Sequence, residues 1–231
     1  MKSAAIFLIV LLLSDFLLVA AGRLFHCIKL VAFQGIIIGL LPLVFWNWSN
    51  GMPHTETFLI SLINLLVKGV LLPLLLSRAM HRTGVKRELE PFIGYSASLM
   101  LTALWTALAF WGSFHWKIGA AAASPLFAPV AFTTMFSGLF IIIARKKAIT
   151  QVIGFLVFEN GIAVFGTGMM LEHGLLVELG VLLDVLVLVF IMGITLFQIS
   201  REFQHIDSDR LNQLDDSKMP VNADLSVEVE Q

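Results

Sequence analysis

Long apolar runs separated by short polar segments dominate the chain. A bilayer core about 30 Å thick requires about 20 apolar residues in one helix. Seven runs of that length cover residues 3–22, 28–47, 57–78, 91–113, 122–144, 148–168 and 174–198. Backbone in lipid must satisfy its own hydrogen bonds, and runs this long are not barrel strands. The pattern therefore predicts an all-α, polytopic integral membrane protein with about seven transmembrane helices.

The composition supports a membrane protein and argues against chemistry carried out by this chain itself. Hydrophobic residues make up 58% of the chain and charged residues 13%, compared with roughly 25% charged residues in soluble domains. The single cysteine, Cys27, excludes an internal disulfide and a cysteine-based zinc or iron–sulfur site. Phosphate-binding, dinucleotide-binding, metalloprotease and serine-hydrolase motifs are absent from the sequence. We therefore expect no cofactor, no metal, no catalytic residue and no nucleic-acid partner.

Lysine and arginine gather in alternate connections between the predicted spans. One side of the membrane would carry Arg23, Lys29, Arg78, Arg82, Lys86, Arg87, Arg145, Lys146, Lys147, Arg201, Arg210 and Lys218. The other side would carry only Lys2 and Lys117. Because lysine and arginine are enriched in cytoplasmic loops, this distribution predicts an N-terminus outside and a cytoplasmic C-terminal tail.

The first 22 residues have a second interpretation. Lys2, the apolar run and the sequence LVAAG also resemble a cleaved signal peptide. Asp15 lies inside that run, and removing the span would spoil the alternation of charge. These two observations favour a retained span.

Weak self-similarity divides the chain into modules. We expect an N-terminal triplet of spans in 1–90, a joining helix and loop in 91–120, a C-terminal triplet in 121–199 and an acidic tail in 200–231. The second span of each triplet follows basic residues and carries a polar group, Gln34-Gly35 in the first triplet and Glu159-Asn160-Gly161 in the second. The tail is predicted to be disordered, apart from a short helix over 207–214 that would suit docking on a cytoplasmic partner.

Ionisable side chains interrupt several spans. Asp15, Lys68, Glu159 and Asp184 lie well inside apolar runs, and Glu178 lies in the outer part of the last run. Each charge at mid-membrane costs roughly 2.5 to 3.5 kcal/mol, and loss of water favours the neutral form of carboxylates and amines. These residues therefore predict a proton relay, with polar support from Asn160 and Gln34. Structural pairing of the same groups between helices is the alternative.

Pro73 lies five residues after Lys68 in the third span. Proline has no backbone N–H, so we expect a loosened helix and a freed carbonyl at this point. That carbonyl would either line a water-bearing cavity or reflect packing alone.

Three blocks in the second half carry a family resemblance. They are RKKAITQVIGFLVFENGI at 145–162, LLDVLVLVFIMGI at 182–194 and HIDSDRLNQL at 205–214. Together they resemble hydrogenase-4 membrane component E, a family of the group 4 energy-converting hydrogenases and formate hydrogenlyase complexes. The likeness covers roughly 140–215, and the earlier spans match in layout and spacing. Through that family, the C-terminal triplet is similar to the K subunit of respiratory complex I and the C subunit of multisubunit sodium/proton antiporters.

The resemblance implies a non-catalytic membrane subunit of an oxidoreductase complex in a bacterial cytoplasmic membrane. Its partners would be antiporter-like and other membrane subunits, together with a peripheral arm that carries metal and iron–sulfur centres. The chain would help to translocate protons or sodium ions.

This sequence departs from the K subunit in the placement of its membrane acids. The K subunit has Gly-x-Glu in its second helix, where this chain has Gly154-Phe155-Leu156. Glu159 lies three residues later on the same helical face, about 4.5 Å along the axis, and would serve the same role. Asp184 approximates the second membrane acid, and Lys68 occupies the comparable place in the first triplet. A structural anchor without a proton path and an independent secondary transporter are the competing hypotheses.

Overall fold

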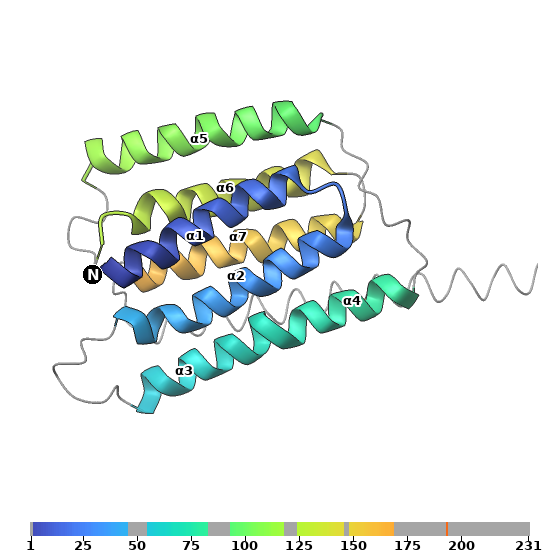
Figure 1. Cartoon of the computed structure of the whole chain (residues 1–231), viewed down its shortest axis with the longest axis horizontal. Helices are drawn as coiled ribbons and strands as arrows, with labels where there is room; N and C mark the ends of the chain where they lie inside the picture. The colour runs from blue at the N-terminus through green and yellow to red at the C-terminus, as the bar shows by residue number, and fades with distance from the viewer. Residues whose placement is uncertain are drawn as a thin grey trace, which may run out of the picture.

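The computed structural model describes residues 2–45, 55–82, 93–117, 124–145, 148–168 and 193 of the 231-residue chain. These residues form an antiparallel helical bundle (Figure 1). The helices are α1 (Lys2–Ala20), α2 (Leu24–Phe45), α3 (Thr55–Leu66), α4 (Leu72–Arg82), α5 (Tyr95–His115), α6 (Phe127–Ala144) and α7 (Ala148–Gly168), and a π-helical turn, η2 (Val67–Leu71), joins α3 to α4 in one rod. Figure 1 shows α5 along one edge, the α3–η2–α4 rod along the other, and α1, α2, α6 and α7 between them.

Several of these helices are long and apolar enough to cross a membrane, in keeping with the expectation. The described residues contain five runs long and apolar enough to cross a membrane: Leu24–Phe45, Thr57–Met80, Tyr95–His115, Phe127–Ala144 and Ile149–Gly168. Ala5–Ala20 of α1 is a shorter apolar helix. The predicted seventh span, 174–198, lies outside the described residues except for Gly193, which is helical.

Hydropathy alone misplaces three of the predicted helix starts. The fourth and fifth spans begin later than 91 and 122, because Gly94 is extended (φ −56°, ψ 151°) and the Phe127 N–H closes a turn onto the Ser124 carbonyl oxygen at 3.2 Å. The second span begins earlier than 28, since the connection from α1 to α2 is only residues 21–23. The sixth span, 148–168, coincides with α7.

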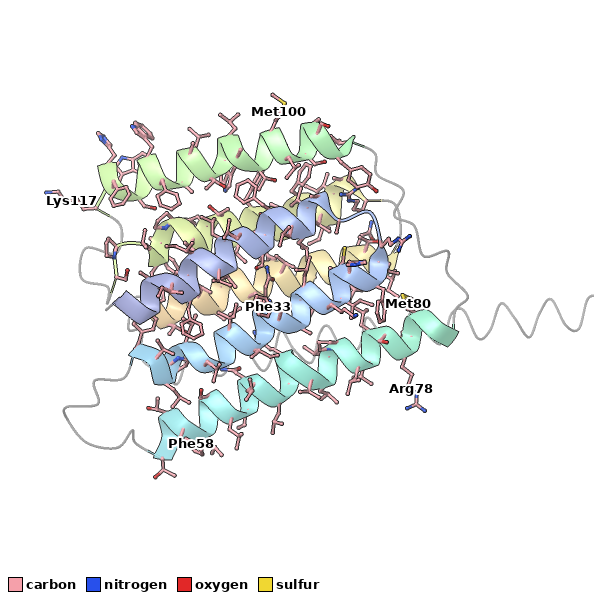
Figure 2. The ribbon with its side chains drawn as sticks, viewed as in Figure 1. Phe33, Phe58, Arg78, Met80, Met100 and Lys117 are labelled. Atoms are coloured by element: carbon pink, nitrogen blue, oxygen red, sulfur yellow. The ribbon has the colours of Figure 1, made fainter. Side chains whose placement is uncertain are left out.

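The helix directions bring basic residues to one end of the bundle. The connections that contain Arg23 and Arg145 lie at the same end as the end of α4 (Figure 1). Figure 2 shows Arg78 and Lys117 at opposite ends, with Arg78 pointing away from the bundle. The separation of the two sides by charge therefore holds for these residues, and which side is cytoplasmic stays a prediction.

The two hairpins α1–α2 and α6–α7 lie side by side. Contacts join α1 to α6 and α2 to α7, and three-residue connections, 21–23 and 145–147, link the helices of each hairpin. Arg145 is buried, donates from Nη2 to the Val19 carbonyl oxygen at 2.9 Å, and lies 5.0 Å from the centre of the Tyr95 ring. It ties the α6–α7 hairpin to the end of α1 and the start of α5. The proposed division into two triplets stays a prediction.

Glycines allow the closest helix contacts. A Cβ on Gly154 would lie 2.7 Å from the Gly138 carbonyl oxygen and 2.9 Å from the Ile142 backbone nitrogen, so α6 and α7 touch through their backbones. On α2, Gly35 and Gly39 are spaced as in the small-xxx-small motif of membrane helices. They face the backbone of Lys68 and Leu65 on the edge rod.

Gly154→Ala should therefore destabilise the bundle. The added methyl group has no free volume, and overpacking costs typically 1–3 kcal/mol. Thermal and denaturant unfolding in detergent would measure the change. Gly94→Ala is the matched control, because nothing lies within 4 Å of a Cβ at that position. Equal stability of the two variants would contradict the close α6–α7 contact.

Candidate functional site: a buried polar layer

A buried ion pair links the edge rod to α7. Lys68 on η2 and Glu159 on α7 lie 2.6 Å apart, Nζ to Oε1, and their side chains are only 5% and 2% exposed. The two residues are 91 positions apart in the sequence. The structure thus brings together two of the predicted relay residues and makes them direct partners.

The π-helical turn at Lys68 has a specific local cause. The Leu72 N–H bonds to the Val67 carbonyl oxygen in the π pattern, and Pro73, the next residue in that register, has no N–H to offer the Lys68 carbonyl. This carbonyl faces Gly35 of α2, where even a Cβ would clash with it. The expected local disturbance before Pro73 is therefore present, and the Lys68 carbonyl packs against a neighbouring helix. π turns often occur at functional sites.

Asp15 forms the second part of the layer and is completely buried. Its Oδ1 accepts a hydrogen bond from Gln34 Nε2 at 2.9 Å, and its Oδ2 lies 2.7 Å from the Thr134 hydroxyl. Gln34 Nε2 also lies 2.9 Å from Ser14 Oγ, and Gln34 Oε1 lies 3.4 Å from Asn160 Nδ2. These contacts connect α1, α2, α6 and α7 at one level of the bundle.

The Thr134 hydroxyl makes Asp15 compatible with two protonation states. A hydroxyl has one proton, and Thr134 Oγ1 is within hydrogen-bond distance of both Asp15 Oδ2 and the Val130 carbonyl oxygen, at 2.7 and 3.0 Å. When Asp15 is ionised, the hydroxyl donates to the carboxylate. When Asp15 is protonated, it can donate to Thr134, whose own proton then turns to Val130. A change of protonation needs only a rotation about one C–O bond.

Apolar clusters close the polar layer towards both ends of the bundle. Along α1, Asp15 lies between Leu11 and Leu18, which belong to different buried clusters. Along α7, Glu159 and Asn160 lie between Val157 and Val164 of the same two clusters. Asp15 and Glu159 therefore lie in a mid-bundle layer bounded by apolar residues on each side.

The structure brings together most, but not all, of the predicted site residues. Lys68, Glu159, Asp15, Gln34 and Asn160 belong to the layer. Glu178 and Asp184 lie outside the described residues.

Sequence reasoning missed two hydroxyl residues, Ser14 and Thr134. Hydroxyls are common in membrane helices because they bond to carbonyls of their own helix, as Thr134 does to Val130 and Ser14 does to Leu11 at 2.6 Å. The sequence signal available for Ser14 was its position beside Asp15, and Thr134 carried none. Among the described residues, no three histidine, cysteine or acidic side chains converge as metal ligands would.

One known protein of similar sequence comes from Mycobacterium tuberculosis strain H37Rv. It is named Uncharacterized protein Rv0085 and is 31% identical over 221 residues, which cover 89% of this chain and 93% of that protein. Neither a protein family model nor a solved structure matches the chain.

Breaking the ion pair should destabilise the protein strongly. Lys68→Met removes the ammonium group 2.6 Å from the buried Glu159 carboxylate, and removal of one member of a buried pair typically costs about 3–5 kcal/mol. The double variant Lys68→Met/Glu159→Leu should recover part of that loss, because no uncompensated charge stays buried. Unfolding in detergent would compare these variants with Lys29→Met, which removes an exposed lysine. A loss at Lys68 as small as that at Lys29 would contradict the pairing.

Thr134→Val should be more damaging than Thr133→Val. Both threonines are fully buried on α6 and bond to carbonyls of their own helix, but only Thr134 also reaches a carboxyl group. Losing a hydrogen bond to a charged group costs about 1.5–3 kcal/mol, against about 0.5–1.5 kcal/mol for a neutral one. The difference would appear in the free energy of unfolding. Identical losses would show that the Asp15 contact contributes nothing.

Proposed function

We propose that this chain, which belongs to the same family as the mycobacterial protein Rv0085, is a non-catalytic membrane subunit of a hydrogenase-related, complex-I-like assembly. In this proposal the buried polar layer contributes protonatable residues to coupled proton translocation. Two kinds of support carry it: the geometry of the layer, and the resemblance of the 145–162, 182–194 and 205–214 blocks to hydrogenase-4 membrane component E. The name of Rv0085 assigns no activity.

The observation that carries the proposal is the Lys68–Glu159 contact in the same layer as Asp15. A carboxylate and an amine 2.6 Å apart in a poorly solvated environment can exist as an ion pair or, after proton transfer, as two neutral groups. Charges interact more strongly there than in water. A proton that arrives at Glu159 therefore changes the electrostatic potential at Asp15. This coupling is what a relay with several protonatable stations requires.

The apolar layers favour a lateral path for protons. Within the described bundle, hydrophobic clusters separate the polar layer from both ends, which disfavours conduction straight through this chain. We propose that protons enter and leave sideways, in the plane of the membrane, through neighbouring antiporter-like subunits. Glu178 and Asp184 of the last predicted span would supply further stations. The peripheral arm with metal and iron–sulfur centres would supply the free energy.

The proposed setting is a bacterial cytoplasmic membrane. With seven spans, the N-terminus would lie outside and the C-terminal tail would lie in the cytoplasm. The bundle end that carries Arg23, Arg78 and Arg145 would then face the cytoplasm, in keeping with the positive-inside rule.

Glu159→Gln tests the relay. The substitution preserves size and removes the protonatable group, so proton translocation by the assembled complex should fall at least about tenfold while its subunit composition stays the same. Pumping would be measured in inverted membrane vesicles and divided by the amount of assembled complex. Thr133→Val is the matched control, since it alters a buried α6 hydroxyl that bonds within its own helix. Full coupling in an assembled Glu159→Gln complex would refute the relay.

The same variant distinguishes the structural-anchor hypothesis, which the interhelical position of the Lys68–Glu159 pair also supports. An anchor predicts that Glu159→Gln loses partner subunits rather than coupling. Purification in mild detergent followed by mass spectrometry would identify the co-purifying chains. Recovery with antiporter-like subunits and a metal-bearing arm supports the assembly. Recovery alone, with ion transport by the purified chain in liposomes, would instead support an independent transporter.

A further inference from the structure

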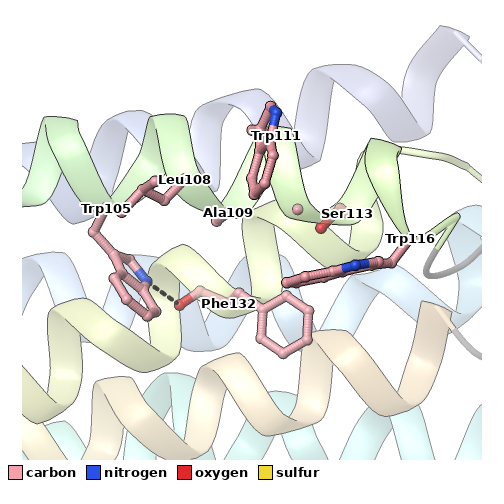
Figure 3. A pocket seen from close by; sticks show the side chains of 8 residues that line it. Trp105, Leu108, Ala109, Trp111, Ser113, Trp116 and Phe132 are labelled. Carbon is pink, nitrogen blue, oxygen red and sulfur yellow. Dashed lines mark hydrogen bonds between the residues drawn. The ribbon is translucent and has the colours of Figure 1, made fainter.

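A cavity separate from the polar layer opens between α5 and α6 (Figure 3). Its volume is about 380 Å³, within the range of small-ligand sites. The lining residues are Trp105, Leu108, Ala109, Trp111, Gly112, Ser113 and Trp116 from α5 and its end, and Phe132 from α6. The walls are almost entirely aromatic and aliphatic, and Ser113 is the one hydroxyl residue among them.

The Ser113 hydroxyl is buried in this wall without a partner. The residue is 4% exposed, and its Oγ has no hydrogen-bond partner among the residues that the structure describes. Other hydroxyls of α5 bond to the carbonyl four residues earlier, as Thr102 does at 2.9 Å and Thr106 at 2.7 Å. The indole N–H of Trp105 is already used by the Phe132 carbonyl oxygen, at 3.2 Å. Ser113 is therefore the one polar side chain in the cavity wall, and its covered hydroxyl would meet an occupant after rotation about the Cα–Cβ bond.

The chemistry of the cavity selects its occupant. A buried water needs two to four polar partners, and one hydroxyl does not provide them. Leu108, Trp111 and Trp116 are 48%, 60% and 67% exposed, so the rim of the cavity faces the surface that lipid would cover. A ligand from the bilayer with a long apolar part and one hydrogen-bond acceptor satisfies both conditions.

The depth of the cavity matches one lipid chain. α5 ends at His115, so Ser113 lies near the end of a membrane-spanning helix. Trp105 lies eight residues earlier, about 12 Å deeper at 1.5 Å per residue. A glycerophospholipid has this arrangement, with ester carbonyls near the membrane surface and acyl chains directed towards its centre.

We propose that the cavity binds one acyl chain of a glycerophospholipid and that the Ser113 hydroxyl donates a hydrogen bond to the ester carbonyl of that chain. The lipid covers the aromatic face of α5 and lies between α5 and α6. This assignment is independent of proton translocation and of any partner subunit.

A pair of lipids tests the hydrogen bond directly. Native mass spectrometry of the full chain would compare retention of a diester phosphatidylglycerol and of its diether analogue, which lacks the ester carbonyls. One retained lipid is expected, with the diester favoured about fivefold, the effect of one ordinary hydrogen bond. Ser113→Ala should remove that preference, whereas Ser96→Ala, at an exposed position of the same helix, should keep it.

Filling the cavity tests the site itself. Ala109→Leu places extra volume in the lining and should abolish lipid retention, whereas Ala103→Leu adds the same volume at an exposed position of α5. Equal retention by these two variants, or the same diester preference in Ser113→Ala as in the unmodified chain, would overturn the proposal. Displacement of the phospholipid by an equal concentration of isoprenoid quinone would overturn the choice of occupant. If Ala109→Leu does not fold, the Ser113→Ala comparison decides.

Discussion

A charge in hydrocarbon requires a partner inside the protein, and the Lys68–Glu159 pair meets this requirement across two helices that are distant in the sequence. The contact places the edge rod beside α2 and α7 at a fixed height. It needs backbones that approach closely, which Gly35 on α2 permits. The ion pair and the glycine contact thus depend on each other, because a larger residue at 35 would push the Lys68 backbone away from the bundle.

The polar layer combines a strong constraint with local freedom. Its heavy atoms are held by packing above and below, in two apolar clusters. Its protons are not fixed in the same way, since the Thr134 hydroxyl serves either Asp15 or its own helix. A rigid frame with mobile protons lowers the reorganisation needed when a proton arrives. That property is the one that the proposed relay requires.

How much of the fold and the site the sequence predicts depends on whether each interaction is local in the sequence or joins distant segments. Apolar run length is a local property, and the sixth predicted span coincides with α7. The starts of the second, fourth and fifth spans depend on turns, which hydropathy does not describe. The cost of burying charge is also local, and it singled out Lys68, Glu159 and Asp15, which the structure shows to be buried. Which of them pair is a long-range property. The contact of Thr134 with Asp15 and the cavity beside Ser113 likewise arise from contacts between helices, which cannot be read from a single sequence.

The π turn has a consequence for the phase of the edge rod. Each residue of an α-helix advances the side-chain direction by about 100°, and a π turn accommodates one additional residue within an otherwise α-helical run. Across the turn, the bundle-facing residues of α3 and α4 are therefore separated in the sequence by one residue more than in a regular α-helix. If the same residues were instead wound as a regular α-helix, one half of the rod would be turned by about 100° relative to the other. Either Lys68 would then be directed away from α7, or the buried leucines of α4, Leu72 and Leu76, would be directed towards lipid. The π turn is therefore what allows both halves of the rod to face the bundle.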